Sequence, residues 1–471
     1  MLPKRKYRKL GRWIAAVSLA VSPLAIPASA AADDLMNSDV TFHNGATTLH
    51  GTVVAPATTG ERRPGLVLIA GAGARDRDSY RPEAEAFARA GIVVLIYDKR
   101  AGYSRATSSF SDLADDAVAG VGLLRTRPDV QTSRVGVWGH SEGGWVAPLA
   151  ASRAAAVDFV VVAGASALPA DRTQLWSNRT YLTHAGVKQA LQEPIGVNLS
   201  RMLVAAGLFG DVGNTPTAAL EKVRQPLLAV FAEYDRSTPP GESMRLFRQA
   251  LARGGNTHYT LRLIRGADHN LRRSTTGFEE PASQASGQGP DHADGGFAPE
   301  YTDTVTRWIA GLTDSPASSD PPPTQTLASQ PVRPLAWYES VGLQLTLLAV
   351  MLVAFAGFLI GRLFRSRLRR GPTSVRRLAG LMALGGLVTV LGTPTYLFWI
   401  VATGATSVGG TVLGRPPLWL LLQVLTVGVI ATGVALAIRW RQSGGGTQLA
   451  LLMAGGVVFA PWAAYWGLLT V

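Results

Sequence analysis

Cysteine is absent from the 471-residue chain, and charged residues make up only 16% of it. The lack of cysteine excludes disulfides, cysteine-ligated zinc, thiol catalysis and a lipid-modified N-terminal cysteine. Soluble proteins carry roughly 25% charged residues. With 47% hydrophobic residues, the deficit argues against a disordered chain and against a purely soluble one. The length also exceeds that of one ordinary domain.

Acidic residues are almost missing from both ends of the chain. Residues 1–12 contain six Lys or Arg and no acid, and residues 336–471 contain ten Arg and one acid, Glu339. These two segments contribute +15 to a net charge of +13, which leaves −2 for the middle of the chain. The nearly neutral middle removes the main support for nucleic-acid binding that the net charge suggests.

The N-terminal segment has the pattern of an export signal. Basic residues up to Arg12 precede an apolar stretch over 13–26, and Ala28-Ser29-Ala30 then forms a cleavage pattern of small residues. This stretch is short for a membrane-spanning helix, and Pro23 interrupts its far end. We predict a signal peptide over residues 1–30, with an uncleaved anchor as the alternative.

The C-terminal part contains four uncharged apolar stretches of bilayer length, at about 341–361, 378–401, 418–438 and 448–469. The loop 362–377 holds seven Arg and the loop 402–417 only one, so the positive-inside rule places the first loop in the cytoplasm. We therefore expect an all-α transmembrane region over 337–471 in the bacterial cytoplasmic membrane, with residues 31–340 on the extracytoplasmic side. Because no stretch contains Asp, Glu, Lys, Arg or His, an anchor is favoured over a transport pathway.

Residues 31–312 have the pattern of an α/β domain. Short apolar runs alternate with amphipathic stretches, which indicates a parallel sheet covered by helices on both faces. The runs are Leu66–Ala70, Ile92–Tyr97, Val135–Trp138, Phe159–Ala163, Leu227–Phe231 and Tyr259–Ile264, after a hairpin signal at Asn44-Gly45. The interval of about 166–222 exceeds one connection and is expected to form a cap. A proline-rich linker over 313–336 then serves as a semi-extended spacer without a core of its own.

A serine nucleophile is indicated by the sequence Gly-His-Ser-Glu-Gly-Gly at 139–144, directly after the run 135–138. This is the G-x-S-x-G pattern in the strand-to-helix context that lifts the hydroxyl of Ser141 off the sheet. Side chains at Gly139 and Gly143 would collide with neighbouring backbone, and Gly144 would let the next helix pack closely. The alternative is a glycine-rich turn with a capping serine. His140 is either a packed neighbour or a positioning residue.

A serine hydroxyl needs a base to take its proton, and the base needs a carboxylate to orient it. In this architecture the order along the chain is serine, acid, histidine. Asp235 follows the run 227–231 and His269 follows the run 259–264, so both fall at carboxyl ends of strands, on the same edge as Ser141. We assign Asp235 as the orienting acid and His269 as the general base.

Five other ionisable residues are weaker candidates for these roles: Glu233, Asp268, His258, His292 and His184. Glu233 is still close to its strand, and Asp268 adjoins His269 and is badly placed to orient that ring. His258 and His292 fit a solvated surface better, and His184 lies in the cap, where it could touch substrate.

The negative charge of a tetrahedral intermediate needs two amide donors. The backbone N–H of Glu142 is expected to supply one. The other should come from the loop after the run 66–70, where we prefer Ala72 and place Gly73 next, with a plain glycine-rich turn as the alternative. This loop lacks phosphate-binding spacing and the seven histidines are scattered, so we expect neither a metal site nor a cofactor.

Together these residues resemble the α/β-hydrolase superfamily, and more narrowly bacterial exported serine esterases. The resemblance runs from about Leu49 to Ile309 and includes Gly71–Asp78, Tyr97-Asp98-Lys99-Arg100, the 139–144 turn and the loops of Asp235 and His269. It implies a doubly wound, mostly parallel sheet with a helical cap. It also implies that Ser141, His269 and Asp235 hydrolyse carboxylic esters through an acyl-enzyme without a cofactor.

The sequence therefore predicts a membrane-tethered serine hydrolase that acts outside the membrane on a small-molecule or lipid acyl ester. We expect the protein to contact the lipid bilayer and to bind no nucleic acid, and the sequence leaves its oligomeric state open. One alternative is a serine peptidase of the prolyl-oligopeptidase type, which usually carries a β-propeller before its catalytic domain, whereas only residues 31 to about 50 precede the first paired strands here. The other is a non-catalytic membrane sensor or binding module.

Overall fold

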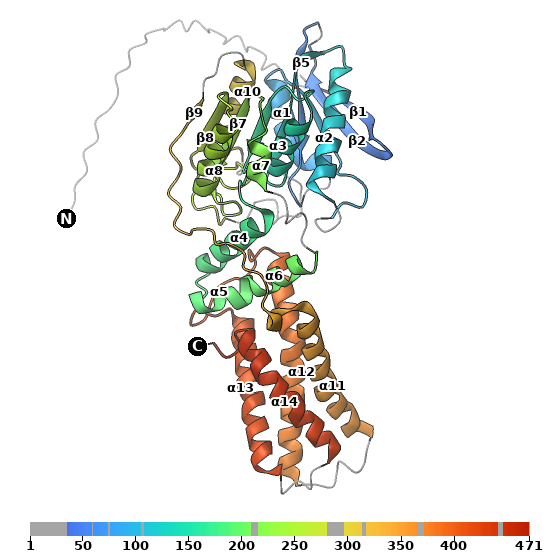
Figure 1. The fold of residues 1–471 in the computed structure, drawn as a ribbon, viewed down its shortest axis with the longest axis vertical. Helices are drawn as coiled ribbons and strands as arrows, with labels where there is room; N and C mark the ends of the chain where they lie inside the picture. Colours follow the sequence, from blue (N-terminus) through green and yellow to red (C-terminus); the bar gives the residue numbers. More distant parts are fainter. Residues whose placement is uncertain are drawn as a thin grey trace, which may run out of the picture.

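The computed structural model describes residues 35–58, 60–73, 76–104, 108–208, 215–279, 296–312, 317–364, 372–440 and 446–470. The predicted signal peptide and His292 lie outside these residues. Along its long axis the molecule has an α/β domain, a layer of short helices and a bundle of four long helices (Figure 1).

A nine-stranded sheet forms the centre of the α/β domain. Its strands are β1 (Leu35–Asn44), β2 (Thr47–Pro56), β3 (Arg63–Ile69), β4 (Val93–Tyr97), β5 (Val130–His140), β6 (Val160–Ala163), β7 (Leu227–Ala232), β8 (Tyr259–Ile264) and β9 (Ser318–Ser319). They lie in the order β1-β2-β4-β3-β5-β6-β7-β8-β9, and all strands from β4 to β9 are parallel. Each apolar run forms a strand, so the predicted α/β-hydrolase sheet is confirmed.

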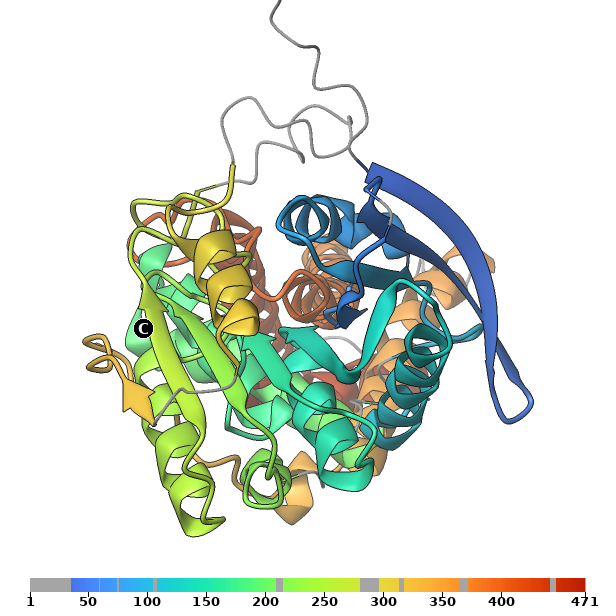
Figure 2. The same ribbon diagram turned by 90° about the horizontal axis from the view of Figure 1, so that it is seen from above.

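Helices cover both faces of this sheet (Figure 2). One face carries α1 (Arg81–Arg89) and α10 (Tyr301–Ala310), and the other carries α2 (Phe110–Arg125), α3 (Gly143–Arg153) and α8 (Pro240–Arg253). Two shorter elements lie on opposite faces: the 3₁₀ turn η1 (Arg77–Tyr80) beside α1, and α7 (Pro216–Leu220) beside α3. Phe87 and Val146 are fully buried on opposite faces. Because the strands from β4 to β9 are parallel, their carboxyl ends lie at one edge of this covered sheet.

Three short helices lie within the interval expected to form a cap: α4 (Ala170–His184), α5 (Gln189–Gly196) and α6 (Asn198–Ala205). They separate the α/β domain from the long helices (Figure 1). Leu182, Leu191 and Ile195 are buried in one apolar cluster with Phe459 and Trp462 of the bundle. The cap and the bundle therefore share a hydrophobic core.

The bundle consists of α11 (Val341–Phe364), α12 (Thr373–Ala402), α13 (Pro417–Ile438) and α14 (Thr447–Tyr465). By length and composition each could cross a membrane. Large apolar side chains point outward along these helices, among them Val353, Val424 and Val457. Such a surface fits a lipid environment, which supports the predicted transmembrane region.

The described part of the predicted linker is extended and is hydrogen-bonded to the α/β domain and the cap. We call this part, residues 317–336, the strap. Ser318 and Ser319 pair with β8, and Asp320 accepts hydrogen bonds from Arg262 and from the backbone N–H of Leu263, both at 2.9 Å. A composition rich in Pro, Ser and Thr carries no sign of such contacts, because they depend on partners far away in the chain.

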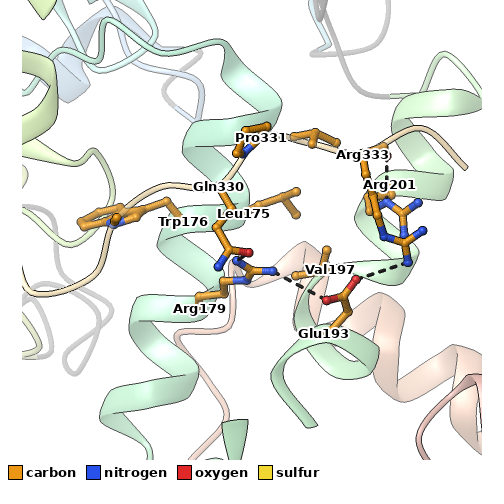
Figure 3. A pocket seen from close by; sticks show the side chains of 11 residues that line it. Leu175, Trp176, Arg179, Glu193, Val197, Arg201, Gln330, Pro331 and Arg333 are labelled. Carbon is orange, nitrogen blue, oxygen red and sulfur yellow. Dashed lines mark hydrogen bonds and ion pairs between the residues drawn. The ribbon is translucent and has the colours of Figure 1, made fainter. Parts of the chain in front are cut away.

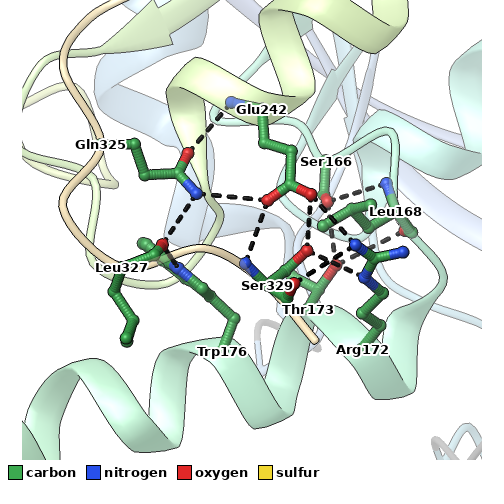
Figure 4. A network of polar contacts seen from close by, with 9 residues as sticks. All are labelled: Ser166, Leu168, Arg172, Thr173, Trp176, Glu242, Gln325, Leu327 and Ser329. Carbon is green, nitrogen blue, oxygen red and sulfur yellow. Dashed lines mark hydrogen bonds and ion pairs between the residues drawn. The ribbon is translucent and has the colours of Figure 1, made fainter. Parts of the chain in front are cut away.

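Further along, the strap contacts the cap through a polar network (Figure 4). The carboxylate of Glu242 at the start of α8 accepts from Arg172 at 3.0 Å and from the Ser329 hydroxyl at 2.7 Å. Gln325 bonds both the backbone and the side chain of Glu242, and the indole N–H of Trp176 donates to the carbonyl of Leu327 at 2.7 Å. The strap thus connects α8 with α4.

A buried ion pair joins the cap to the entrance of the bundle. Arg201 of α6 donates to both carboxylate oxygens of Glu339, at 3.1 and 2.9 Å, and Glu339 ends the 3₁₀ turn η2 (Trp337–Glu339) just before α11. The side chains of Arg201 and Glu339 are 2% and 1% exposed. Arg333 of the strap pairs with the same carboxylate at 2.8 and 2.9 Å.

Beside this ion pair, the strap and the cap line a partly open pocket of about 100 Å³, and Arg179, Glu193 and Arg333 are among its lining residues (Figure 3). Burial opposes ionisation of Glu339, but the hydrogen bonds from Arg201 and Arg333 outweigh it and lower the pKa of Glu339 to about 2. The carboxylate is therefore charged at neutral pH and holds cap, strap and bundle together.

We expect Arg201→Met to lower the free energy of unfolding by about 3 kcal/mol, because it removes one partner of a buried charge while Arg333 still compensates part of it. Thermal unfolding of the full chain in detergent measures this. Arg262→Met, which removes an exposed ion pair with Asp320, should cost under about 1 kcal/mol. Equal effects of the two substitutions would contradict the role given to the buried pair.

The lowered pKa of Glu339 also predicts a pH dependence. Its contribution to stability is complete above the unfolded pKa of about 4.5 and is lost as the pH falls towards 2. Glu339→Gln should therefore unfold at a lower temperature than the wild type at neutral pH, and the difference should shrink on acidification through that window. A difference in unfolding temperature that stays constant with pH would contradict the stabilising role of the charged Glu339 carboxylate.

Candidate active site

Ser141 lies on a strained turn between β5 and α3, with a backbone φ of +53°. The surrounding glycines are required by close backbone contacts. A Cβ at Gly139 would overlap the carbonyl of Gly143, and a Cβ at Gly143 would overlap the carbonyl of Ile69. A Cβ at Gly144 would come within 2.5 Å of the Cβ of Ala165, so α3 packs closely on the end of β6. The predicted reasons for all three glycines match these contacts.

The structure brings Ser141, His269 and Asp235 into one row of hydrogen bonds. Nε2 of His269 lies 3.0 Å from Oγ of Ser141, and Nδ1 of His269 lies 2.9 Å from Oδ2 of Asp235. Ser141 follows β5, Asp235 follows β7 and His269 follows β8, so all three stand at carboxyl ends of parallel strands. The row can move a proton from a serine hydroxyl to an imidazole.

Asp235 is buried, and its carboxylate accepts three further hydrogen bonds. They come from the backbone N–H groups of Ser237 and Thr238, at 2.8 and 2.7 Å, and from the Thr238 hydroxyl at 2.7 Å. Burial raises the pKa of Asp235, but His269 and these donors outweigh it, so the pKa is lowered and the carboxylate stays charged. Burial lowers the pKa of His269, but the charge of Asp235 outweighs it, so that pKa is raised.

His140 connects the loop of Gly71 with the backbone of His269. Its Nε2 lies 2.9 Å from the carbonyl oxygen of His269, which can only accept, so Nε2 carries the proton. Nδ1 therefore accepts from the Tyr80 hydroxyl at 2.8 Å, and that hydroxyl accepts from the backbone N–H of Gly71 at 2.9 Å. Burial lowers the pKa of His140 to about 3, which keeps the ring neutral as this arrangement requires. The contacts favour a positioning residue over a packed neighbour.

Glu142, on the other side of Ser141, connects the turn with the same loop. Its carboxylate accepts from Lys99 at 2.7 Å and from the Tyr103 hydroxyl at 2.6 Å. Lys99 also donates to the carbonyl of Gly71 at 2.7 Å, and the Tyr103 hydroxyl lies 3.3 Å from the carbonyl of Ala72. Glu142 and Lys99 are both buried, so this ion pair is shielded from water.

These contacts orient the candidate oxyanion donors. In a trans peptide the C=O and N–H groups point in opposite directions, so the bond from Lys99 to the Gly71 carbonyl turns the N–H of Ala72 away from Lys99. Within the described ranges, the N–H groups of Ala72, Gly73 and Glu142 donate to no protein acceptor. A Cβ at Gly71 would lie 3.4 Å from that of Ser141, so the loop borders the serine. Ala72 and Gly73 both remain candidates beside Glu142.

The weaker candidates take other places in the structure. The Glu233 carboxylate accepts from the backbone N–H of Gly266, and Asp268 accepts from the backbone N–H groups of Asn270 and Arg272 within its own loop. His258 is exposed, and the described part of the chain contains no group of three or more His, Asp or Glu that could hold a metal.

Sequence reasoning assigned no role to Lys99, Tyr103 and Tyr80, which bind the residues beside Ser141. Lys99 belongs to the quoted Tyr97-Asp98-Lys99-Arg100 stretch, at the end of β4. Its position at the carboxyl end of a strand indicated that Lys99 lies near the site, but this position alone does not predict the ion pair with Glu142.

The domain that contains this site matches known proteins in sequence. Residues 79–286, which contain Ser141, Asp235 and His269, match the model of the Prolyl oligopeptidase family. Esterase EstD of Thermotoga maritima is 28% identical over 210 residues, or 40% of this chain. The chain spans about half the length of that curated relative, since the match covers 50% of EstD.

Several solved hydrolases show a distant structural similarity to this chain. A dienelactone hydrolase-like promiscuous phosphotriesterase from metagenomic libraries is 15% identical, with a TM-score of 0.40, over 59% of this chain and 99% of its own. The acylaminoacyl peptidase of Pyrococcus horikoshii is 16% identical, with a TM-score of 0.40, over 60% of this chain and 42% of its own.

The parallel sheet, its helices and the strand-to-helix turn of Ser141 form the fold that the sequence predicted. The family match and the EstD relative both fall on this domain and leave the four long helices outside. The chain therefore carries an α/β-hydrolase domain, and its similarities in sequence support a serine hydrolase.

Proposed function

We propose that the chain hydrolyses carboxylic esters at the outer face of the bacterial cytoplasmic membrane. The observation that carries this proposal is the row of Ser141, His269 and Asp235, with distances of 3.0 and 2.9 Å at the end of a parallel sheet. Oγ of Ser141 attacks the ester carbonyl while Nε2 of His269 takes its proton. The C–O bond to the alcohol then breaks, the alcohol takes the proton from His269, and an acyl-enzyme remains.

Water completes the reaction with the same groups. His269 takes a proton from the water, whose oxygen attacks the acyl carbon, and Ser141 leaves with that proton restored. Asp235 orients the ring and stabilises the imidazolium. In both halves the N–H groups of Glu142 and of Ala72 or Gly73 receive the negative charge of the tetrahedral oxygen. No step requires a cofactor.

Ester hydrolysis is supported by the similarity to Esterase EstD, while peptide hydrolysis is the second candidate because the matching family is named for prolyl oligopeptidase. The same row of residues serves both reactions. A panel of matched ester and amide substrates separates them.

The outer face of the membrane is supported by charge. Segment 402–417, between α12 and α13 at the cap end of the bundle, holds one Arg. Segment 362–377, which joins the sequences of α11 and α12, holds seven, and the end of α11 and the start of α12 lie at the opposite end of the bundle. Positive residues stay in the cytoplasm, so the α/β domain lies outside. Protease accessibility of the α/β domain in intact cells and in inverted vesicles tests this placement.

Labelling of the intact membrane protein with a fluorophosphonate tests for an activated serine. We expect Ser141→Ala to abolish labelling, and His269→Ala to slow it by about 10⁴-fold or more, because the serine then has no base. Ser166→Ala is the matched control, since Ser166 bonds Thr173 in the cap and should leave labelling unchanged. A folded wild-type protein that is not labelled would argue against the proposed function.

The raised pKa of His269 predicts how the rate depends on pH. Only the neutral imidazole accepts the serine proton, so kcat/KM should fall on acidification, with its midpoint above the 6.5 of an ordinary histidine. In Asp235→Asn the midpoint should move to lower pH because the carboxylate charge is gone, and kcat should drop by about 10⁴-fold. Steady-state kinetics across pH measure both effects. An unchanged midpoint would contradict the assignment of Asp235.

Lys99→Met tests whether the buried ion pair positions the oxyanion loop. We expect kcat to fall by about 10²-fold, with little change in KM, because the carbonyl of Gly71 is no longer held. The single substitution also leaves Glu142 buried without its cation, so the double variant Lys99→Met, Glu142→Gln should regain thermal stability but not kcat. If activity returned together with stability, Lys99 would have a structural role only.

A further inference from the structure

An anchor needs only a flexible connection, but the α/β domain of this chain is fixed to its bundle in one orientation. The backbone N–H of Lys188, just before α5, donates to the carbonyl of Gly414 in the loop between α12 and α13, at 2.9 Å. A Cβ on Gly467, past α14, would lie 2.6 Å from Cγ of Pro194. With the shared apolar cluster and the Arg201–Glu339 pair, these contacts hold the cap on one end of the bundle.

The candidate active site faces that same end. Helix α4 lies between the carboxyl edge of the sheet and the long helices (Figure 1). On its sheet side, Tyr181 and His184 contact Phe278, in the segment that follows His269, and the His184 ring stacks on Phe278 at 3.6 Å. On its bundle side, Leu182 is buried among residues of the long helices. Helix α4 packs on α5 and α6, and these two helices in turn contact α12, so the cap forms a layer two helices deep between the site and the long helices.

Apolar side chains are exposed where the cap meets the bundle. Leu208, just after α6, is 60% exposed, and Leu413, in the loop that bonds to the cap, is 76% exposed. Trp337 and Tyr338 stand exposed at the start of α11, where aromatic residues mark the boundary between lipid and water. In a bilayer that surrounds the four long helices, Trp337 and Tyr338 lie at the level of the outer-leaflet headgroups, because they directly precede α11.

From this arrangement we infer that the substrate is an acyl ester resident in the outer leaflet, which enters the site from the bilayer beneath the cap. The inference rests on the proposed ester hydrolysis and names its substrate class. A site that the packed cap holds above the outer leaflet receives amphiphiles that diffuse in two dimensions, at a much higher local concentration than from solution. Leu208 and Leu413 then form the apolar border that an acyl chain crosses on leaving the bilayer.

Two esters with the same leaving group test this inference in vesicles of phosphatidylcholine that contain the full chain. p-Nitrophenyl acetate is soluble, and p-nitrophenyl palmitate stays in the bilayer. We expect p-nitrophenyl palmitate placed in the same vesicles as the enzyme to be hydrolysed at least about tenfold faster than p-nitrophenyl palmitate supplied in separate, protein-free vesicles. Its rate should also follow its mole fraction in the bilayer, so that adding phosphatidylcholine to the vesicles lowers the rate at constant total substrate.

Substitutions at the border give the second test. Leu208→Ser combined with Leu413→Ser should lower palmitate turnover by about fivefold or more and leave acetate turnover unchanged, since neither residue touches the reacting groups. Met36→Ser, at an exposed apolar position of β1, is the matched control and should change neither rate.

The outcomes separate this inference from the proposed function. Acetate turnover with equal palmitate rates from both vesicle populations would overturn the membrane route and leave ester hydrolysis standing. Loss of acetate and palmitate turnover alike in the border variant would also overturn it, because the residues would then act on the fold. Absence of both ester activities in a protein that unfolds cooperatively would overturn the proposed function itself.

Discussion

Close backbone packing at the carboxyl end of β5 sets the position of everything that touches Ser141. The positive φ of Ser141 costs about 1–3 kcal/mol, and it persists because Gly143 lies against the carbonyl of Ile69 and Gly144 against Ala165. Those neighbours belong to β3 and to the end of β6, which the parallel ladder and the helices on both faces hold in register. The strained serine thus depends on the whole buried sheet.

The residues on either side of Ser141 connect this rigid turn to the rest of the site through hydrogen bonds. His140 bonds the backbone of His269 and, through Tyr80, the N–H of Gly71. Glu142 reaches the carbonyl of the same Gly71 through Lys99. Base, nucleophile and oxyanion loop are therefore connected through one buried turn, and a displacement of any of them strains hydrogen bonds that water cannot replace.

The same principle of buried polar contacts extends to the membrane region. Arg201 and Glu339 bury opposite charges where cap, strap and bundle meet, and the strap bonds Glu242 at the start of α8. Helix α8 follows the loop of Asp235, so the membrane entrance and the candidate site are joined by a short series of packed elements. The distance of the site from the membrane is consequently set by packing and does not depend on the length of a free linker.

Local patterns in the sequence were enough to predict the sheet, the long helices and the three residues that meet at its edge. Periodicity, glycines at a tight turn and residues at strand ends report local backbone geometry, and parallel strands then bring Ser141, Asp235 and His269 together. Only the tertiary structure revealed the roles of Lys99, the strap and Arg201. Lys99 lies 43 residues from Glu142, and Arg201 lies 138 residues from Glu339. Pairs this distant leave no local pattern, because their contact exists only once the elements between them have packed.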